Sequence, residues 1–385
     1  MPWQEVTVSA QRLAFVQEAL RGERSFAALC RAYGISRKTG YKWLQRYRQA
    51  GEAGLQDGSR RPHHMPRRTA PEIEALVVRV RQEHPAWGGR KIAAYLQRQG
   101  HPSVPHPSTI TAILRRHGLL GPRQPRQRVV RRFQAAHPND LWQIDFKAPM
   151  LFGDGKRYPL LTVLDDASRM LLTLVLCPRM TLEVVEQTLV HTFRRYGLPK
   201  ALLHDNGPPW GTGDRRRYTR LEAWLLTLGV RVRRSRPYHP QTLGKDERLH
   251  RTLEAELASL AAQTPLPQAA EVLEAWRQMY NEQRPHEALE HRAPTEVYQP
   301  SPRRWQGQLP TLEYPDGAQL RKVDKFGFLH FQGQRYRVGR GLAGYVLGLV
   351  ERKDEPHVWD LYLGAEHLSR LVIDTQANPE GRREV

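Results

Sequence analysis

The stretch LWQIDFKAPMLFGDGKRYPLLTVLDDASRMLLTLVLC, residues 141–177, decides the fold of the central part of the chain. It contains three runs rich in apolar and β-branched residues, at 141–152, 156–166 and 168–177. The first run alternates its faces, as a strand with two different environments does. We therefore expect three successive strands, and the short connections between them favour antiparallel pairing.

The sequence after these strands changes repeatedly between helical and extended patterns. It predicts a helix, a strand, a helix, a strand and two final helices, at residues 181–196, 198–205, 220–228, 230–235, 244–262 and 266–281. Three strands followed by this alternation describe a mixed α/β sheet with an antiparallel edge. That order matches an RNase H-like fold, which we place at residues 139–300.

Residues 1–57 are predicted to form a helix-turn-helix DNA-binding domain. In FAALCRAYGISRKTGYKWLQRY, residues 26–47, Gly34 breaks a first helix and Ser36 can cap the second. The second helix is basic, as expected of a helix that enters the major groove, and an ordinary α-hairpin is the alternative. The candidate DNA contacts on this helix are Arg37, Lys38, Thr39, Lys42 and Arg46.

Residues 71–120 predict a second, helix-turn-helix-like DNA-binding domain. Its last helix carries Arg115 and Arg116, which are candidate phosphate contacts. Two Pro- and Arg-rich segments without periodicity, at 58–70 and 121–138, are predicted to be basic linkers.

The C-terminal part, residues 301–385, has a different pattern. Short alternating segments such as HVWDLYLG (357–364) and EHLSRLVI (366–373) are separated by turns that contain Gly or Asp. They predict a small β-barrel. The chain is therefore expected to be multidomain, with all-α units first, then an α/β core, then a β domain.

The formal net charge is +21, and it is unevenly distributed. Residues 1–135 carry 25 Lys and Arg against 8 Asp and Glu, whereas the remainder is nearly balanced. A charge that serves solubility is the alternative, but a charge of this size indicates a polyanionic partner, most commonly nucleic acid. We expect the first third of the chain to make most of the phosphate contacts.

Cysteine content and hydropathy indicate the compartment. Cys30 and Cys177 form neither a disulfide framework nor a zinc pattern, which fits a reducing cytosol. The N-terminus lacks the apolar segment of a signal peptide, and apolar runs such as Met170 to Cys177 are too short to span a bilayer. We expect a cytoplasmic protein without a membrane partner.

Three carboxylates occupy positions suited to metal chemistry. Asp145 lies mid-strand among apolar residues, Asp205 ends the fourth strand, and Glu247 lies just inside a helix. A buried charge is costly unless it is paired or binds a metal. Mg²⁺ prefers hard oxygen ligands, and phosphodiester chemistry uses two such ions about 3.5–4 Å apart. Taken singly, each carboxylate has the commoner interpretation of a surface group or a cap.

Five strings resemble the DDE transposases of the retroviral-integrase type, most closely the IS481-like group of the IS3-related insertion sequences. They are LWQIDFK (141–147), LDDASR (164–169), HDNGPPWGTG (204–213), RPYHPQTLGKDERLHRTL (236–253) and YNEQRPHEALEHRAPTEVY (280–298). The fourth string is the most specific. The resemblance extends from the first helix-turn-helix to about Tyr298.

The resemblance implies a catalytic and metal-binding triad of Asp145, Asp205 and Glu247. These residues would hold two Mg²⁺ ions, for which Mn²⁺ can substitute, and Asn206 and Gly207 would shape the loop beside them. A flexible loop would contact the donor DNA end. The loop residues implied are Tyr238, His239, Gln241 and Lys245.

The implied function is that of an insertion-sequence transposase, a polynucleotidyl transferase of the bacterial cytoplasm and nucleoid. It would bind terminal inverted repeats, free a 3′-hydroxyl and join it to double-stranded target DNA, as a dimer or larger homo-oligomer. Two alternatives remain at this stage. One is a DNA-binding regulator with weakened catalysis, and the other is an RNase H-type nuclease acting on RNA–DNA hybrids.

Two positions depart from the family pattern. Relatives often carry Lys or Arg seven residues after the catalytic Glu, where this chain has Glu254, so Arg251 is the candidate to supply the phosphate contact. Asp246 stands where relatives usually have an apolar residue. Because adjacent helix positions point about 100° apart, we expect Asp246 to face solvent and not to be a ligand.

Other conspicuous residues receive structural interpretations. The pair Asp165 and Asp166 is expected to support a hairpin turn. Trp142 and Trp210 are suited to stacking on bases, although we favour core packing for Trp142.

Overall fold

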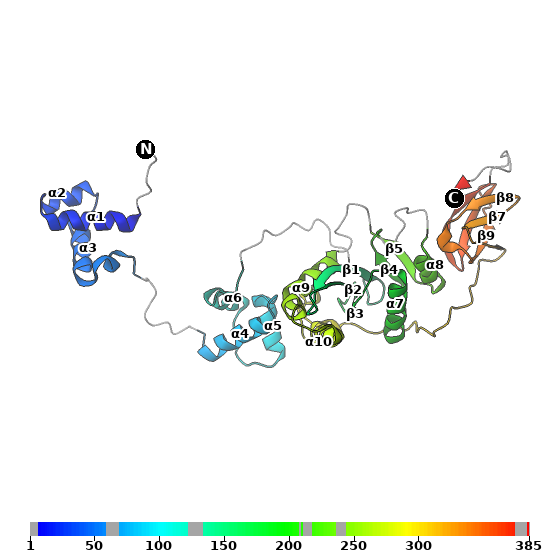
Figure 1. Ribbon diagram of the computed structural model, residues 1–385, viewed down its shortest axis with the longest axis horizontal. Helices are drawn as coiled ribbons and strands as arrows, with labels where there is room; N and C mark the ends of the chain where they lie inside the picture. Colours follow the sequence, from blue (N-terminus) through cyan, green and yellow to red (C-terminus); the bar gives the residue numbers. More distant parts are fainter. Residues whose placement is uncertain are drawn as a thin grey trace. The chain divides into compact units, whose positions relative to one another are not determined.

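The computed structural model describes seven segments of the chain, namely residues 7–58, 69–121, 134–207, 209–210, 218–235, 244–373 and 383–384. The chain divides into two compact units, Met1–Arg68 and Thr69–Val385 (Figure 1). Most of both predicted linkers, 58–70 and 121–138, falls outside the described segments. Each unit has an apolar core of its own.

The N-terminal unit is a small helical domain. Its elements are α1 (Val8–Arg21), α2 (Phe26–Ala32), α3 (Arg37–Ala50) and the 3₁₀ helix η1 (Gly51–Leu55). The Ser36 side chain accepts a hydrogen bond from the Thr39 amide and caps α3. Phe15, Leu29 and Leu44 are buried in a core that all three α-helices share. The predicted helix-turn-helix is therefore present.

The second unit begins with another helical bundle. Its helices are α4 (Pro71–Glu83), α5 (Gly89–Arg98) and α6 (Pro107–Arg116). They surround Trp87, Ile92 and Ile110, each fully buried. A Cβ at Gly89 would lie 2.3 Å from the Pro107 carbonyl oxygen, so α5 and α6 touch through backbone at this point. The second predicted helical unit is thus also present.

The central domain is built on a five-stranded sheet. Its strands are β1 (Trp142–Leu151), β2 (Arg157–Asp165), β3 (Leu171–Leu176), β4 (Ala201–His204) and β5 (Arg231–Arg234). The strand order is β3-β2-β1-β4-β5. Strand β1 is antiparallel to β2 and parallel to β4, as the sequence predicts for a mixed sheet with an antiparallel edge.

Helices cover both faces of this sheet. They are α7 (Leu182–Tyr196), α8 (Arg220–Thr227), α9 (Gly244–Ala261) and α10 (Ala269–Glu282), with short 3₁₀ turns η3 (Leu266–Gln268), η4 (Glu287–Leu289) and η5 (Pro294–Glu296). Helices α7 and α8 pack on the face that carries Trp142 and Ile144. Helices α9 and α10 pack on the opposite face, over Leu160 and Leu164. The observed order and layering are those of an integrase core.

The C-terminal strands do not form the predicted closed barrel. They are β6 (Gln319–Lys322), β7 (Phe328–Phe331), β8 (Gln334–Arg337), β9 (Val346–Glu351), β10 (Val358–Leu363), β11 (Glu366–Val372) and β12 (Arg383–Glu384), with η6 (Arg340–Leu342). They make two open sheets, β11-β10-β9-β6 and β12-β8-β7, around one apolar core. Alternation predicts strands, but closure depends on which strands pair, so the barrel prediction is not confirmed.

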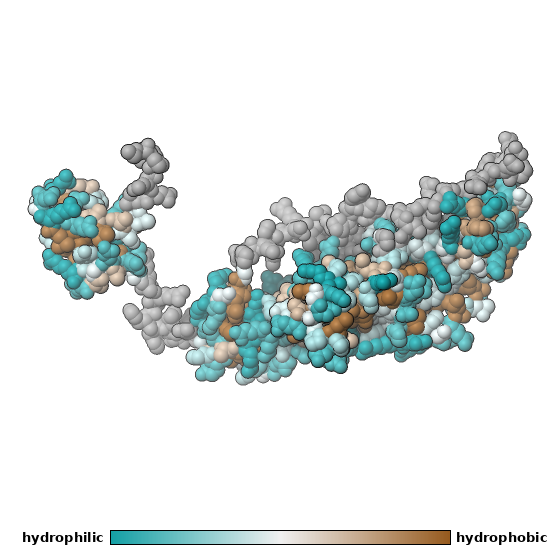
Figure 2. Space-filling view, in the orientation of Figure 1, coloured by the Kyte–Doolittle hydropathy of each residue, from teal (hydrophilic) through white to brown (hydrophobic). Residues whose placement is uncertain are grey.

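Surface hydropathy follows the composition. Hydrophilic side chains dominate the face shown in Figure 2, and exposed large apolar residues such as Tyr41, Leu260 and Phe326 belong to separate elements. Among the helices of the described segments, none combines the length and the apolar character that crossing a bilayer requires.

Candidate active site

Strand β1 presents a row of polar side chains to helix α9. The core-facing residues Trp142 and Ile144 alternate with Gln143, Asp145 and Lys147, as the two-residue period of a strand requires. Asp145 lies opposite Thr162 of β2 in the register, and its carboxylate accepts a hydrogen bond from the Phe146 amide at 2.8 Å. The Asp145 side chain is 23% exposed, so it is partly buried, and we call the surroundings of Asp145, with His250 and Thr162, the recess.

The charges of the three predicted triad members act on one another at Asp145. Burial, the charge of Asp205 and the charge of Glu247 raise the pKa of Asp145 to about 6, against the lowering effect of the Phe146 amide. The effect of the two other carboxylates on the pKa of Asp145 is the main electrostatic feature of the site.

His250 lines the same recess one turn after Glu247. Its Nδ1 atom lies 3.9 Å from an Asp145 carboxylate oxygen, and its Nε2 atom lies 3.0 Å from the Thr162 hydroxyl. Burial and the charge of Lys147 lower the pKa of His250 to about 4, which keeps the ring neutral near pH 7. The candidate site thus has a neutral imidazole beside its central carboxylate.

Asp205 directly follows β4, at the edge where the parallel strands end. Its carboxylate accepts a hydrogen bond from the Gly207 amide at 3.1 Å, and the Asn206 side chain donates to the Ser235 carbonyl at 2.8 Å. These two bonds form a tight turn after the strand and tie it to the end of β5. Asn206 and Gly207 therefore shape the turn that follows Asp205.

Glu247 and Asp246 occupy the first turn of α9 in opposite environments. Glu247 is exposed, whereas Asp246 is fully buried, so the expectation that Asp246 faces solvent is wrong. The buried face of α9 runs Asp246, Leu249, Leu253, Leu257 at helical spacing. Burial, Asp145 and Asp166 raise the pKa of Asp246 well above its usual range.

No three His, Cys, Asp or Glu side chains of the described residues lie close enough together to hold a single ion. What the site has is a central Asp145 that interacts separately with Asp205 and with Glu247. This arrangement suits ions held by pairs of carboxylates with water completing the shell, as Mg²⁺ accepts.

Lys245, predicted to contact DNA, is bound within the protein. Its ammonium group donates to the buried carboxylate of Asp166, which also accepts from the Gln143 side chain at 2.5 Å. Asp165 accepts from the Ser168 amide and hydroxyl at 2.8 and 2.6 Å. Asp165 therefore supports the turn, as expected, whereas the Asp166 carboxylate connects β1 to the start of α9.

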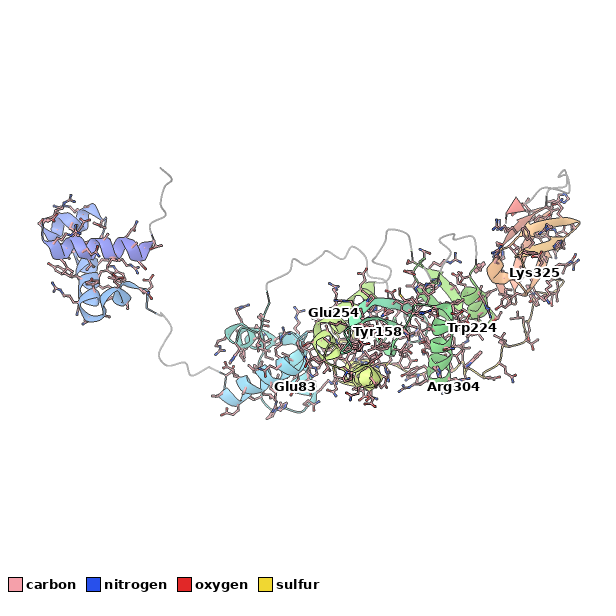
Figure 3. All side chains as sticks on the ribbon, viewed as in Figure 1. Glu83, Tyr158, Trp224, Glu254, Arg304 and Lys325 are labelled. Carbon is pink, nitrogen blue, oxygen red and sulfur yellow. The ribbon has the colours of Figure 1, made fainter. Side chains whose placement is uncertain are left out.

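The acidic residue at position 254 has a partner that the sequence did not suggest. Glu254, labelled on α9 in Figure 3, accepts a hydrogen bond from the Lys147 ammonium group at 2.5 Å. The Lys147 side chain is only 6% exposed, whereas that of Glu254 is 60% exposed. The site thus receives a cation from β1, and Arg251 is exposed one turn before Glu254.

A buried ion network lies behind Asp205. Glu222 of α8 accepts from Arg234 at 2.5 and 2.7 Å and lies 3.3 Å from His204 Nε2. The His204 ring lies 2.6 Å from the Asp205 carbonyl oxygen and stacks on Trp210. Trp210 is 1% exposed, so the suggestion that it stacks on bases is wrong, whereas core packing of Trp142 is confirmed.

The predicted DNA contacts on α3 have mixed environments. Arg37, Lys38 and Lys42 are exposed, whereas the Thr39 hydroxyl lies 2.9 Å from the Ser36 hydroxyl at the helix start. Arg46 lies 5.1 Å from the ring of Trp43, over which it packs. The exposed face of this helix also contains Tyr41 and Gln45, which the sequence patterns did not single out.

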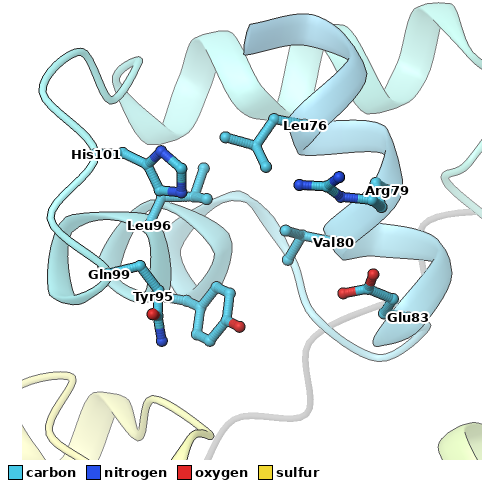
Figure 4. Close-up of a pocket in the computed structure, with 8 residues that line it drawn as sticks. All are labelled: Leu76, Arg79, Val80, Glu83, Tyr95, Leu96, Gln99 and His101. Carbon is cyan, nitrogen blue, oxygen red and sulfur yellow. The ribbon is translucent and has the colours of Figure 1, made fainter. Parts of the chain in front are cut away.

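The structure describes the predicted contacts on α6 but not most of those in the loop before α9. Arg115 is exposed, and Arg116 pairs with Glu74 at 3.3 Å. Tyr238, His239 and Gln241 lie outside the described residues. A cavity of about 290 Å³ between α4 and α5, lined by residues that include Arg79, Glu83 and Tyr95, lies within the helical bundle and contains none of the predicted residues (Figure 4).

Comparison with known proteins places these features in a family. Integrase core domain models match residues 135–240 and 228–294, a helix-turn-helix domain model matches 11–63, and a homeodomain-like domain model matches 39–114. An insertion element IS407 protein of 31.7 kDa from Burkholderia multivorans is 31% identical over 58% of this chain and 79% of that protein. The chain belongs to the insertion-sequence DDE transposases of the integrase type.

A second insertion-element relative and a solved structure are also similar to this chain. An insertion element IS476 protein of 39.2 kDa from Xanthomonas euvesicatoria is 26% identical over 69% of this transposase-family chain and 76% of the relative. Among solved structures, the HTLV-2 integrase catalytic core domain in complex with magnesium matches 43% of this chain and 99% of that one, at 13% identity and a TM-score of 0.34. The family combines helix-turn-helix units with an integrase core, and this member has both.

Proposed function

We propose that this transposase-family chain cuts DNA at the ends of its element and joins the freed 3′-hydroxyl to target DNA, with Asp145, Asp205 and Glu247 as the catalytic carboxylates. The observation that carries the proposal is the position of Asp145, whose pKa is raised by both of the other two. The three carboxylates come from a central strand, a strand end and a helix start, and a carboxyl whose pKa is shifted by burial and by neighbouring charges is characteristic of functional sites.

The residues fit a divalent metal by their chemistry. The carboxylates supply hard oxygen ligands, and the His250 ring beside Asp145 has a pKa of about 4, so it is neutral near pH 7 and does not neutralise the carboxylate. Asp145 would be shared by two ions, with Asp205 and Glu247 each completing one pair. When bound, Mg²⁺ would increase the nucleophilicity of the attacking oxygen and stabilise the leaving oxygen.

The chain's own residues would orient the reacting groups. The hydrogen bond from the Gly207 amide holds the Asp205 carboxylate at the strand end, and the Phe146 amide holds Asp145. Lys147 supplies a cation next to the recess. The two helix-turn-helix units would bind the terminal inverted repeats, and since two ends are joined, we propose at least a dimer on DNA.

Replacing Asp145 by Asn tests the proposal. We expect the variant to lose strand joining by at least about a hundredfold, because a shared ligand is removed, while it binds the repeats that flank its reading frame with unchanged affinity. Joining would be measured with a labelled repeat end, a plasmid target and Mg²⁺ or Mn²⁺. Glu271→Gln, on an exposed part of α10, is the matched control. Undiminished joining by the Asn variant contradicts the assignment.

The same assay distinguishes the alternative functions. A regulator would bind the repeats without joining them in the wild-type form, and an RNase H-type nuclease would cleave an RNA–DNA hybrid in preference to the duplex end. We expect neither result, because the charge of the first 135 residues and the two helical units favour duplex DNA.

A further inference from the structure

Helix α5 is fixed against the segment that follows α10 by several polar contacts. Arg90 pairs with Glu287 at 3.5 Å, and Arg98 pairs with Glu296 at 3.3 Å. Arg98 also donates to the Glu282 carbonyl at 2.9 Å. The second helical bundle and the catalytic domain therefore meet at a defined junction along α5.

Lys91 lies at this junction, in the first turn of α5, and is half-buried. Burial, then the charges of Arg284 and Arg248, lower the pKa of Lys91 to about 7, and the opposing effects of Glu256 and Glu287 are smaller. In the part of the chain that the structure describes, the Lys91 ammonium group makes no hydrogen bond and no ion pair. It is a half-buried cation on which the charges of Arg284 and Arg248 act more strongly than those of Glu256 and Glu287.

The same cations converge on His286. Burial, Arg284, Lys91, Arg169 and Arg248, in that order, lower the pKa of His286 well below its usual value. The Nε2 atom of His286 is buried and has no hydrogen-bond partner among the described residues. We call the four cations, Lys91, Arg169, Arg248 and Arg284, the junction cluster.

The acids near the junction cluster are already engaged. Glu256 accepts from Arg284 at 2.5 Å and from the Trp276 indole at 3.2 Å. Glu287 pairs with Arg90, at the outer side of α5. Arg248, like Lys91, has no partner within the described segments. Lys91 is half-buried, whereas Arg248 is exposed. An unpaired cation in a partly buried position is costly, and an anion bound at Lys91 would offset that cost.

We propose that Lys91 and Arg248 together bind one phosphate of the DNA backbone, next to Arg284. The inference rests on the proposed function. Arg248 directly follows Glu247, so this phosphate would lie near the scissile strand and would hold it between the second helical bundle and the catalytic domain. An ammonium group and a guanidinium group are suited to a phosphate, the first as a point charge and the second as a bidentate donor.

Replacing Lys91 by Met gives a sharp test, because the two measured effects have opposite signs. We expect the melting temperature of the DNA-free protein to rise, since an unpaired cation is removed at nearly constant volume. We expect the affinity for a blunt duplex of arbitrary sequence to fall, and the slope of log affinity against log salt to decrease by about one. Arg248→Gln should decrease the slope similarly, and Lys91→Arg should restore it.

Arg90→Met is the matched control. Arg90 is adjacent on α5 but exposed and paired with Glu287, so we expect its salt slope to equal that of the wild type. Inorganic phosphate distinguishes the source of the anion. If millimolar phosphate raises the melting temperature of the wild type as much as the duplex does, a free anion and not DNA occupies the junction.

Two results overturn the inference. One is an unchanged affinity and salt slope in Lys91→Met, and the other is a lowered melting temperature without any effect on DNA binding, which would make Lys91 a structural residue only. Failure of the proposed function looks different. In that case the wild type itself does not join strands, whereas a failed junction site leaves wild-type joining intact.

Discussion

Whether a single side chain in this protein is buried or exposed depends on which face of its helix or strand packs against the core. The apolar stripe of α9, from Leu257 back to Leu249, reaches Asp246 when it is extended by one turn. That places Asp246 against β1 and turns Glu247 toward solvent. A helical wheel drawn on the assumption that Glu247 points inward gives the opposite result. Asp246 could therefore have been placed correctly from its spacing to the three leucines.

Lys91 has a consequence for the pH dependence of stability. Its pKa is about 7 in the folded chain and ordinarily 10.5, so between these values the unfolded chain binds the extra proton. Stability from this group therefore rises with pH through that window. Lys91→Met should be more stable than the wild type below about pH 7, and its advantage should shrink toward pH 10.5.

The measurement is chemical denaturation of the DNA-free wild type and variant at matched pH values across this window. The charges of Arg284, Arg248, Glu256 and Glu287 all act on Lys91, and both proteins contain these four residues. A constant difference between the two proteins at every pH would show that Lys91 does not titrate there.

At the scale of secondary structure, the helices and strands were largely predictable from the sequence, whereas the pairing of the strands was not. The strand runs around Asp145 and Leu171 and the long helix from Gly244 have clear periods, and each occurs within a few residues of its predicted bounds. The closed barrel failed because alternation does not say which strands share hydrogen bonds. Lys91 was missed because its helix was predicted but the packing of that helix against distant residues, shown by the pairing of Arg90 with Glu287, was not.

The packing of α8 against β4 and β5 depends on one buried carboxylate. Burial raises the pKa of Glu222, but His204, Arg234 and the Thr219 amide outweigh it and lower the pKa to about 2. Glu222→Gln should destabilise the chain by about 3–5 kcal/mol near neutral pH, since it removes the buried charge that Arg234 binds. Because the folded-state pKa is depressed, the difference from the wild type should shrink as the pH falls from about 4.5 toward 2.

Urea titrations at several pH values would measure this effect, with the exposed Glu271→Gln as the control. A loss below about 1 kcal/mol near neutral pH would show that the network is solvated and contributes little.

The first helix-turn-helix depends on a close approach at Gly40. A Cβ there would lie 2.8 Å from the Cys30 sulfur and 2.9 Å from the edge of the Phe15 ring. Gly40→Ala gains up to about 1 kcal/mol of helix propensity but overpacks the core at a cost of about 1–3 kcal/mol. We therefore expect a lower melting temperature for the N-terminal unit and weaker repeat binding. Gln17→Ala, on the exposed face of α1, should change neither, and unaltered binding by Gly40→Ala would show that α3 shifts without consequence.

At the scale of the whole molecule, the proposed function separates DNA recognition from chemistry along the chain. The excess positive charge lies in the first 135 residues, which include both helical bundles, and the carboxylates lie in the nearly balanced part that follows. The two parts meet at α5, where Arg90 and Arg98 contact the catalytic domain. An end bound by the second bundle would thereby be presented to the recess around Asp145.

The position of β1 at the centre of the sheet also determines when, during synthesis of the chain, the recess can form. Its neighbours β4 and α9 are translated long after it, so the recess around Asp145 is complete only once the ribosome has passed residue 261. The N-terminal unit has its own core and can fold much earlier. A chain released before residue 244 would keep the DNA-binding helices and lack Glu247. We expect such a fragment to occupy element ends without joining them, and so to compete with the full-length chain that the same message encodes.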